Sequence, residues 1–121
     1  MESQQNVDDA LRSILRYEEV LGAVALSREG LVLGTAAIDE QDADWIGALG
    51  ASLVGAADRT ARRLGAGTAD NIIVGTSDGM IHLRSDGEFA VMVFTEQCDP
   101  GSVTGICEQV VGEIKAVLTA R

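Results

Sequence analysis

The sequence is poor in aromatic residues and in basic residues. Aromatics make up only 3% of the 121 residues, whereas hydrophobic residues make up 46%. The core must therefore consist of aliphatic side chains. Nineteen acidic residues against nine basic ones give a net charge of −10. Nucleic acids and anionic membrane surfaces attract basic patches, so this charge argues against both as partners.

Cysteine and histidine are too sparse to build a metal site or a disulfide framework. Cys98 and Cys107 are separated by eight residues, which matches no common zinc motif, and we expect buried free thiols. His82 is the only histidine and has no partner at the spacing of a nucleophilic or metal site. We expect it at the surface or half-buried on a strand. The segment 65–71, "GAGTADN", lacks the order of a P-loop or a dinucleotide fingerprint. We expect no metal, no cofactor and no GTP binding by the chain itself.

Long apolar runs are also missing. No run approaches the roughly 20 residues that a membrane helix needs, and the N-terminus does not have the pattern of a secretory leader. We expect residues 1–6 to be disordered, residues 7–121 to form a single domain, and the protein to be cytoplasmic without membrane insertion.

The apolar pattern predicts the order α-β-β-α-β-β-β-α. The expected helices cover about 7–17, 42–65 and the segment after Asp99, and the expected strands cover 19–27, 31–36, 71–77, 80–85 and 88–96. Tight turns separate the neighbouring strands, with "REG" at 28–30 and "DG" at 78–79 and 86–87. Such connections favour an antiparallel sheet and an α+β fold. The strand 88–96 is apolar on both faces and is expected at the centre, and 71–77 is expected at an edge.

The second helix contains three interior glycines, each of which costs about 1 kcal/mol of stability relative to alanine. Four small residues at a spacing of four form one stripe along it, namely Ala43, Gly47, Ala51 and Gly55. Small side chains allow another backbone to approach closely. The stripe is either a surface for pairing with a second helix or a close approach to the chain's own sheet.

A second stripe on this helix favours one of these two explanations. Ile46, Leu49 and Leu53 lie one step around the helix and suit the core better. We therefore assign the small stripe to pairing with a second helix.

Four further residues of the helix are candidates for contact with a partner. Trp45 is expected to cover one end of the core, although tryptophan also anchors partners at interfaces. Arg59, Arg62 and Arg63 complement the dipole at the C-terminal end. Alternatively, one of them contacts an acidic patch on a partner or reaches a nucleotide phosphate as an arginine finger.

Three segments carry a resemblance to a known family: "VLGAVALSREGLVLGTA", "DADWIGALGASLVGAADRTARRLG" and "NIIVGTSDGMIHLRSDGEFAVMVF". From about residue 7 to 119 the chain resembles the Roadblock/dynein light-chain family. Its "SREGLV" turn is similar to the turn of bacterial and archaeal members, which include GTPase regulators of gliding motility. The resemblance implies a five-stranded antiparallel sheet of order 2-1-5-4-3, as in profilin and longin folds. The second helix would cover one face, and the terminal helices would cover the other.

The resemblance also implies partners. Members of the family form homodimers or pair with a paralogue; their second helices run antiparallel, and their third strands join into one ten-stranded sheet. This arrangement would place Ile73 and Gly75 at the interface beside the small stripe. Bacterial and archaeal members often accompany a small Ras-like GTPase, sometimes beside a sensor kinase.

The sequence thus predicts a non-enzymatic dimeric platform that binds and regulates a small Ras-like GTPase. One alternative is a scaffold subunit of signalling or motor complexes that leaves nucleotide turnover unchanged. Another is a small-ligand sensor domain, although the low aromatic content counts against a ligand pocket.

Overall fold

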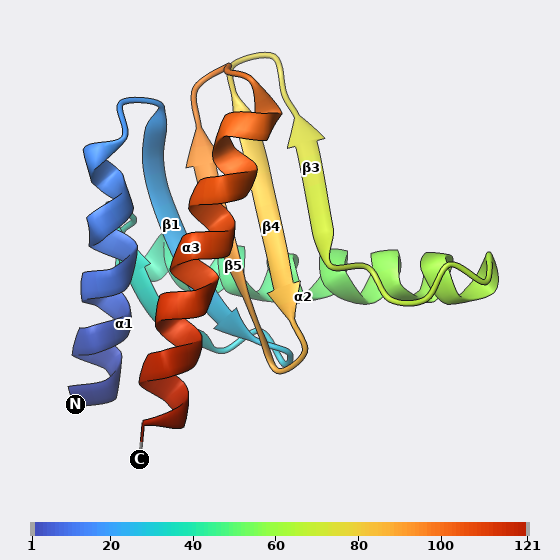
Figure 1. Cartoon of the computed structure of the whole chain (residues 1–121), viewed down its shortest axis with the longest axis horizontal. Helices are drawn as coiled ribbons and strands as arrows, with labels where there is room; N and C mark the ends of the chain where they lie inside the picture. The colour runs from blue at the N-terminus through green and yellow to red at the C-terminus, as the bar shows by residue number, and fades with distance from the viewer. Residues whose placement is uncertain (1, 121) are drawn as a thin grey trace.

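The computed structural model describes residues 2–120 and has a sheet with helices on both faces (Figure 1). The strands are β1 (Val20–Ser27), β2 (Val32–Ala36), β3 (Asn71–Gly75), β4 (Met80–Asp86) and β5 (Phe89–Thr95). All neighbouring pairs are antiparallel, in the order β2-β1-β5-β4-β3. Helices α1 (Glu2–Ser13) and α3 (Pro100–Thr119) lie on one face, and α2 (Glu40–Arg63) lies on the other. The predicted fold class, strand order and layering are confirmed, with β5 central and β3 at an edge.

The first helix begins earlier than the sequence predicts. It starts at Glu2 rather than near residue 7, so residues 2–6, which were expected to be disordered, are helical. A short 3-10 turn over Ile14–Arg16 follows it. The expected disorder of Met1 lies outside the described residues. Glutamate and glutamine are good helix formers, and the buried side chains of Val7 and Leu11 hold the following turns against the sheet.

Most of the core lies between the sheet and the pair α1 and α3. It is aliphatic, as the composition predicts. Its buried members include Val7, Leu11, Ile14, Ala23, Val91, Val93, Val103, Val110 and Ile114. Cys107 is buried in it and Cys98 is half-buried, and both are free thiols in the described structure. Burial raises the pKa of the Cys107 thiol to about 11, so this sulfur stays protonated and unreactive at neutral pH.

A second, smaller core lies under α2. Val54 contacts this cluster from the helix, and Leu26, Leu83 and Met92 contribute to it from three strands. The helix runs across the sheet and continues beyond β3 (Figure 1). Asp58 is its last buried residue. From Arg59 to Gly67 the chain is exposed at every position except Ala61.

The turn between β1 and β2 lies directly against α2. Gly30 has a φ of +92°, a conformation that favours glycine. A Cβ added to Gly47 would lie 2.9 Å from the Gly30 carbonyl oxygen. The helix can therefore lie this close to the turn only because position 47 carries no side chain.

His82 on β4 is buried, with only 1% of its surface exposed. The expectation of a surface or half-buried histidine is therefore wrong. Its strand neighbours are Ile73 and Val93, and the Arg84–Glu108 ion pair, 3.7 Å long, joins β4 to α3 nearby. Among the described residues its Nε2 atom has no hydrogen-bond partner. Burial lowers the pKa of the His82 imidazole from its usual 6.5.

The contact at Gly47 predicts opposite effects for two glycine-to-alanine changes. Gly47→Ala should lower the free energy of unfolding, because the clash with a backbone oxygen outweighs the gain in helix propensity. Gly112→Ala is the matched control, since beyond its chain neighbours and the backbone of its own helix turn its Cβ would meet no described atom within 4 Å. It should raise stability by up to about 1 kcal/mol. Urea unfolding measures both, and equal stabilisation by the two changes would contradict the close approach.

The buried imidazole predicts a stability that falls in mild acid. Since the folded state has the lower pKa, the unfolded state binds the proton first as the pH falls below 6.5. The melting temperature should therefore begin to drop below about pH 7.5 and continue to drop as the pH falls through 6.5 towards the lower pKa of the folded state. In His82→Leu this part of the pH dependence should disappear. If the variant kept the same loss of stability in mild acid, groups other than His82 would be its cause.

Candidate functional site

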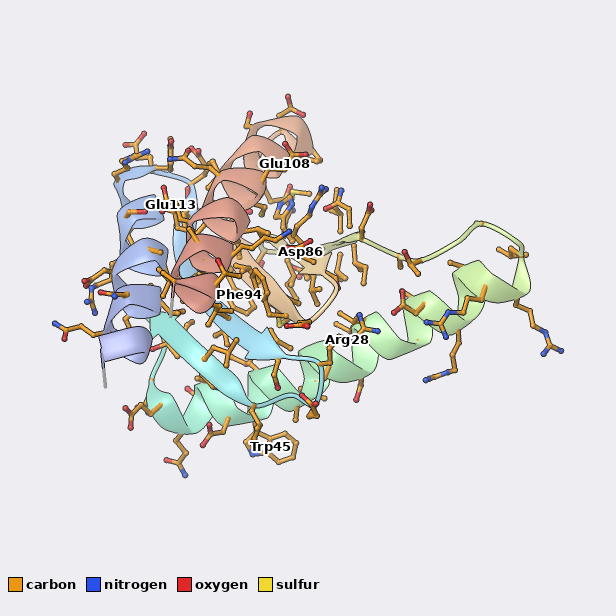
Figure 2. All side chains as sticks on the ribbon, turned by 60° about the horizontal axis from the view of Figure 1, so that its bottom comes forward. Arg28, Trp45, Asp86, Phe94, Glu108 and Glu113 are labelled. Atoms are coloured by element: carbon orange, nitrogen blue, oxygen red, sulfur yellow. The ribbon has the colours of Figure 1, made fainter. Side chains whose placement is uncertain are left out.

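The outer face of α2 carries three large apolar side chains that the chain leaves uncovered. Trp45, Leu49 and Leu53 are 71%, 55% and 39% exposed. Figure 2 shows Trp45 extending from the helix away from the sheet. The expectation that Leu49 and Leu53 face the core is wrong, and so is the expectation that Trp45 covers one end of it. Ile46 alone of the predicted core stripe packs against the second core, and it is half-buried.

The opposite side of α2 forms the buried row. Its members follow the helical spacing of three and four and are Ala43, Gly47, Gly50, Val54 and Asp58. Ala43 and Gly47 are covered by the chain itself and are out of reach of a second helix, so the predicted pairing stripe is corrected at these two positions. From the sequence, the larger side chains of α2 were expected in the core. The nearby β1–β2 turn, however, leaves room only for small side chains.

The other two residues of the predicted stripe lie at the border between the buried and exposed sides. Ala51 is half-buried against the second core. Gly55 is also half-buried, and a Cβ there would lie 3.3 Å from Nη1 of Arg59. Both are accessible enough to lie beside an interface formed by the outer face.

Strand β3 adds a sheet edge to this surface. It is the last strand beyond β4, and an edge strand presents backbone groups to which another strand can pair. Ile73 is 42% exposed and Gly75 is exposed. On the side of the sheet that α2 covers, Ile72, Ile81 and Phe94 are only partly buried. The apolar surface of the sheet thus continues past the point where the second core ends.

Asp58 fixes the direction in which α2 leaves the sheet. Its Oδ1 accepts a hydrogen bond of 2.8 Å from the N–H of Ala69, and its Oδ2 accepts one of 3.1 Å from Nη2 of Arg28. Nη1 of Arg28 donates to the carbonyl oxygen of Gly87 at 2.8 Å. The bond from Ala69 and then the Arg28 cation hold the pKa of the Asp58 carboxyl below its usual value. This network joins the helix to three loops, and only a lone Asp in an otherwise small and apolar row could have pointed to it in the sequence.

The three candidate arginines lie on the part of α2 that extends beyond this network. Arg59, Arg62 and Arg63 are exposed. Within the part of the chain that the structure describes, none of them forms an ion pair. By helical spacing, Arg59 and Arg63 continue the exposed side of α2 that carries Trp45 and Leu49.

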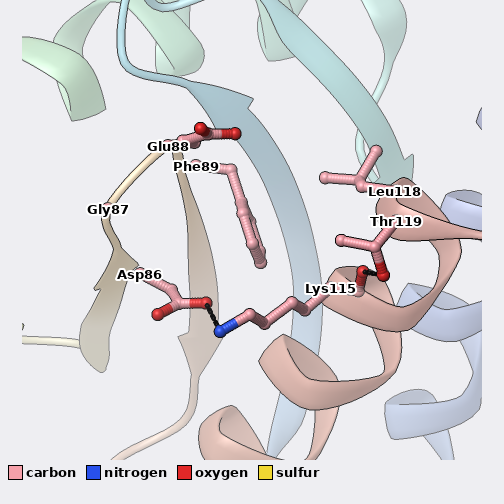
Figure 3. A pocket seen from close by; sticks show the side chains of 7 residues that line it. All are labelled: Asp86, Gly87, Glu88, Phe89, Lys115, Leu118 and Thr119. Atoms are coloured by element: carbon pink, nitrogen blue, oxygen red, sulfur yellow. Dashed lines mark hydrogen bonds and ion pairs between the residues drawn. The ribbon is translucent and has the colours of Figure 1, made fainter.

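A separate groove of about 410 Å³ lies between the β4–β5 turn and α3 (Figure 3). Phe89 and Leu118 line it, and Lys115 pairs with Asp86 at 3.5 Å. These charges neutralise each other, which leaves few free polar groups to orient a ligand. Among residues 2–120 no group of three metal-ligating side chains is found. No helix in that range is both long enough and apolar enough to cross a bilayer.

Comparison with known proteins agrees with this architecture. The model of the Roadblock/LC7 domain matches residues 6–96. An uncharacterized protein of Methanocaldococcus jannaschii, MJ0310, is 27% identical over 90 residues, which are 74% of this chain and 79% of that protein.

Two solved structures share the fold over nearly the whole chain. Myxococcus xanthus MglB is 12% identical, with a TM-score of 0.88 over 99% of this chain and 92% of that one. A structure of MglB with a tetrameric arrangement is 17% identical, with a TM-score of 0.84 over 97% and 90% of the two chains. By the domain match and the fold together, this chain belongs to the Roadblock/LC7 domain family.

Proposed function

We propose that two copies of this chain pair through the outer face of α2 and the edge of β3, and that the dimer binds and regulates a small Ras-like GTPase. The observation that carries the pairing is the uncovered row of Trp45, Leu49 and Leu53. Single exposed apolar residues are ordinary on protein surfaces, but a contiguous patch indicates an interaction site. Tryptophan is also enriched among the residues that dominate binding energy.

The extension of α2 beyond its own sheet supports the same pairing. In a two-fold dimer with joined β3 strands, this part of the helix would lie under the sheet of the second copy. There it would cover Ile72, Ile81 and Phe94, which are only partly buried within one chain. Ile73 and Gly75 would lie where the two strands join. Ala51 and Gly55 would flank the helix contact, and Ala43 and Gly47 would stay inside each copy.

The GTPase role rests on family membership and on charge. The chain has no phosphate-binding loop of its own, and Roadblock proteins of bacteria and archaea often accompany small Ras-like GTPases. A net charge of −10 favours a partner with a basic surface, because opposite potentials steer the encounter. The platform would act by binding the GTPase rather than by carrying out chemistry. The alternative is a scaffold that binds without changing GTP turnover.

Leu49→Glu should convert the dimer to a folded monomer, because it places a charge in the centre of the apolar face. Sedimentation at micromolar concentration measures the change. Leu21→Glu is the matched control, since Leu21 is an equally exposed leucine, 52% against 55%, outside α2 and β3. A wild-type chain that sediments as a monomer would contradict the proposed pairing.

The regulatory role predicts a change in GTP hydrolysis. When the wild-type chain is added to a small Ras-like GTPase from the same genome, the rate of phosphate release should change. Leu49→Glu should abolish that effect, because the binding platform is lost, whereas Leu21→Glu should preserve it. Binding with unchanged turnover would favour the scaffold instead.

A further inference from the structure

The two edges of the sheet differ. Strand β3 ends the sheet on one side and β2 ends it on the other, and α1 lies at the side away from β3 (Figure 1). β3 has the sequence NIIVG, without a charged residue. Within the described residues no side chain hydrogen-bonds to its backbone, and the bonds from Gln97 reach only Thr76 and Ser77 in the turn that follows. The β3 edge is therefore open to another strand.

The outer side of β2 is closed by Asp8 of α1. Thr35 lies opposite Val24 of β1, but its N–H donates to Oδ1 of Asp8 at 2.9 Å. Opposite residues of an antiparallel pair either exchange both backbone bonds or direct both groups outward. Thr35 is therefore a position at which a further strand would bind β2. The Asp8 carboxylate occupies the donor that such a strand would need.

A close approach of α1 to β2 holds this carboxylate in place. A Cβ added to Gly34 would lie 2.6 Å from Cγ1 of Val7 and 2.7 Å from Oδ1 of Asp8, so the helix can lie here only because position 34 carries no side chain. Val7 is buried in the main core. The turn of α1 that carries Asp8 is thus anchored by apolar packing, and the carboxylate is held at the edge of β2.

Two further carboxylates lie beside the same edge. A small cavity of about 160 Å³ is lined by Asp8, Val32, Thr35, Glu40, Ala43 and Asp44. Glu40 and Asp44 are exposed, and among residues 2–120 neither forms an ion pair. If two copies approached each other by their β2 strands, these carboxylates would come near their equivalents, and like charges repel each other. Charged side chains are a common protection of edge strands.

We propose that Asp8 keeps the β2 edge closed against the β2 strand of a second copy, so that the sheet can be extended only at β3. A strand can pair with its own copy around a two-fold axis, because the same surface is used on both sides. With the axis at Thr35, each Thr35 N–H would donate to the Thr35 carbonyl oxygen of the other copy. Two open edges would allow a sheet to grow without limit, whereas one open edge ends at a pair. The inference does not depend on the proposed pairing of α2.

Removal of the acceptor tests the inference. Asp8→Ala should associate through β2 at high salt concentration, which screens Glu40 and Asp44. Its average mass in sedimentation should therefore rise with protein concentration above that of the wild type. In dilute solution the Thr35 amide proton should exchange at least about tenfold faster than in the wild type, because its bond to a carboxylate is lost. The exchange should slow again at high concentration, when the edge is paired.

Three comparisons separate the closed edge from other effects of the substitution. Asp8→Asn retains an acceptor oxygen and should keep the wild-type mass. Asp9→Ala changes the net charge equally, at a neighbouring residue that pairs with Arg12 on the surface, and should also keep it. Thr35→Pro added to Asp8→Ala removes the edge donor itself, so the mass should return to that of the wild type.

Asp8→Lys is a second variant without an acceptor, and it also reduces the acidic charge at the edge, so it should associate at lower salt concentration. Circular dichroism verifies that the variants are folded. If the folded Asp8→Ala and Asp8→Lys chains keep the wild-type mass at every concentration, the inference is overturned. Association that persists with Thr35→Pro would overturn it as well. A monomeric wild type contradicts only the pairing of α2 and β3 proposed above, because this test compares each variant with the wild type.

Discussion

The structure depends on the contact between the turn at Gly30 and the helix at Gly47. With the turn this close, the side of α2 that faces the sheet must carry small residues near its N-terminal end. The large apolar residues of the helix are consequently displaced to the opposite side. Helical glycine lowers stability by about 1 kcal/mol relative to alanine, and here that loss is the consequence of close packing within the chain. The exposed Trp45 and Leu49 are therefore part of the same packing solution as the buried Gly47.

The second constraint is the buried carboxylate of Asp58. It ends the buried row and bonds to both the loop before β3 and the β1–β2 turn through Ala69 and Arg28. A charge at this depth is stable because hydrogen bonds and a cation satisfy it. The network holds α2 across the sheet, so that the residues after Asp58 extend past β3 as a regular helix. The position of the candidate surface thus depends on one side chain that does not belong to that surface.

The sequence was sufficient to predict the fold, but it was not sufficient to predict which side of α2 faces the sheet. Hairpin turns such as "DG" at 86–87 and the apolar strand 88–96 act locally, so the antiparallel pairing, the central place of that strand and the edge position of β3 could be predicted. The full strand order followed only from the family resemblance, because β1 pairs with the distant β5. The choice between two stripes on one helix depends on a turn that lies distant in sequence, and hydrophobicity alone favoured the wrong stripe. The burial of His82 was missed for the same reason, because it lies on the face of β4 whose Arg84 pairs with Glu108 of α3, a segment far along the chain.

The two sides of α2 are therefore under different physical requirements, and together they account for its unusual composition. The inner side needs small residues where the turn approaches, and larger ones such as Val54 where the sheet recedes. The outer side carries the exposed apolar side chains Trp45 and Leu49, for which the inner side has no room beside the turn. The charges at the two ends meet a third requirement, because the acidic residues in the first turn of α2 and the arginines in its last turn complement the helix dipole.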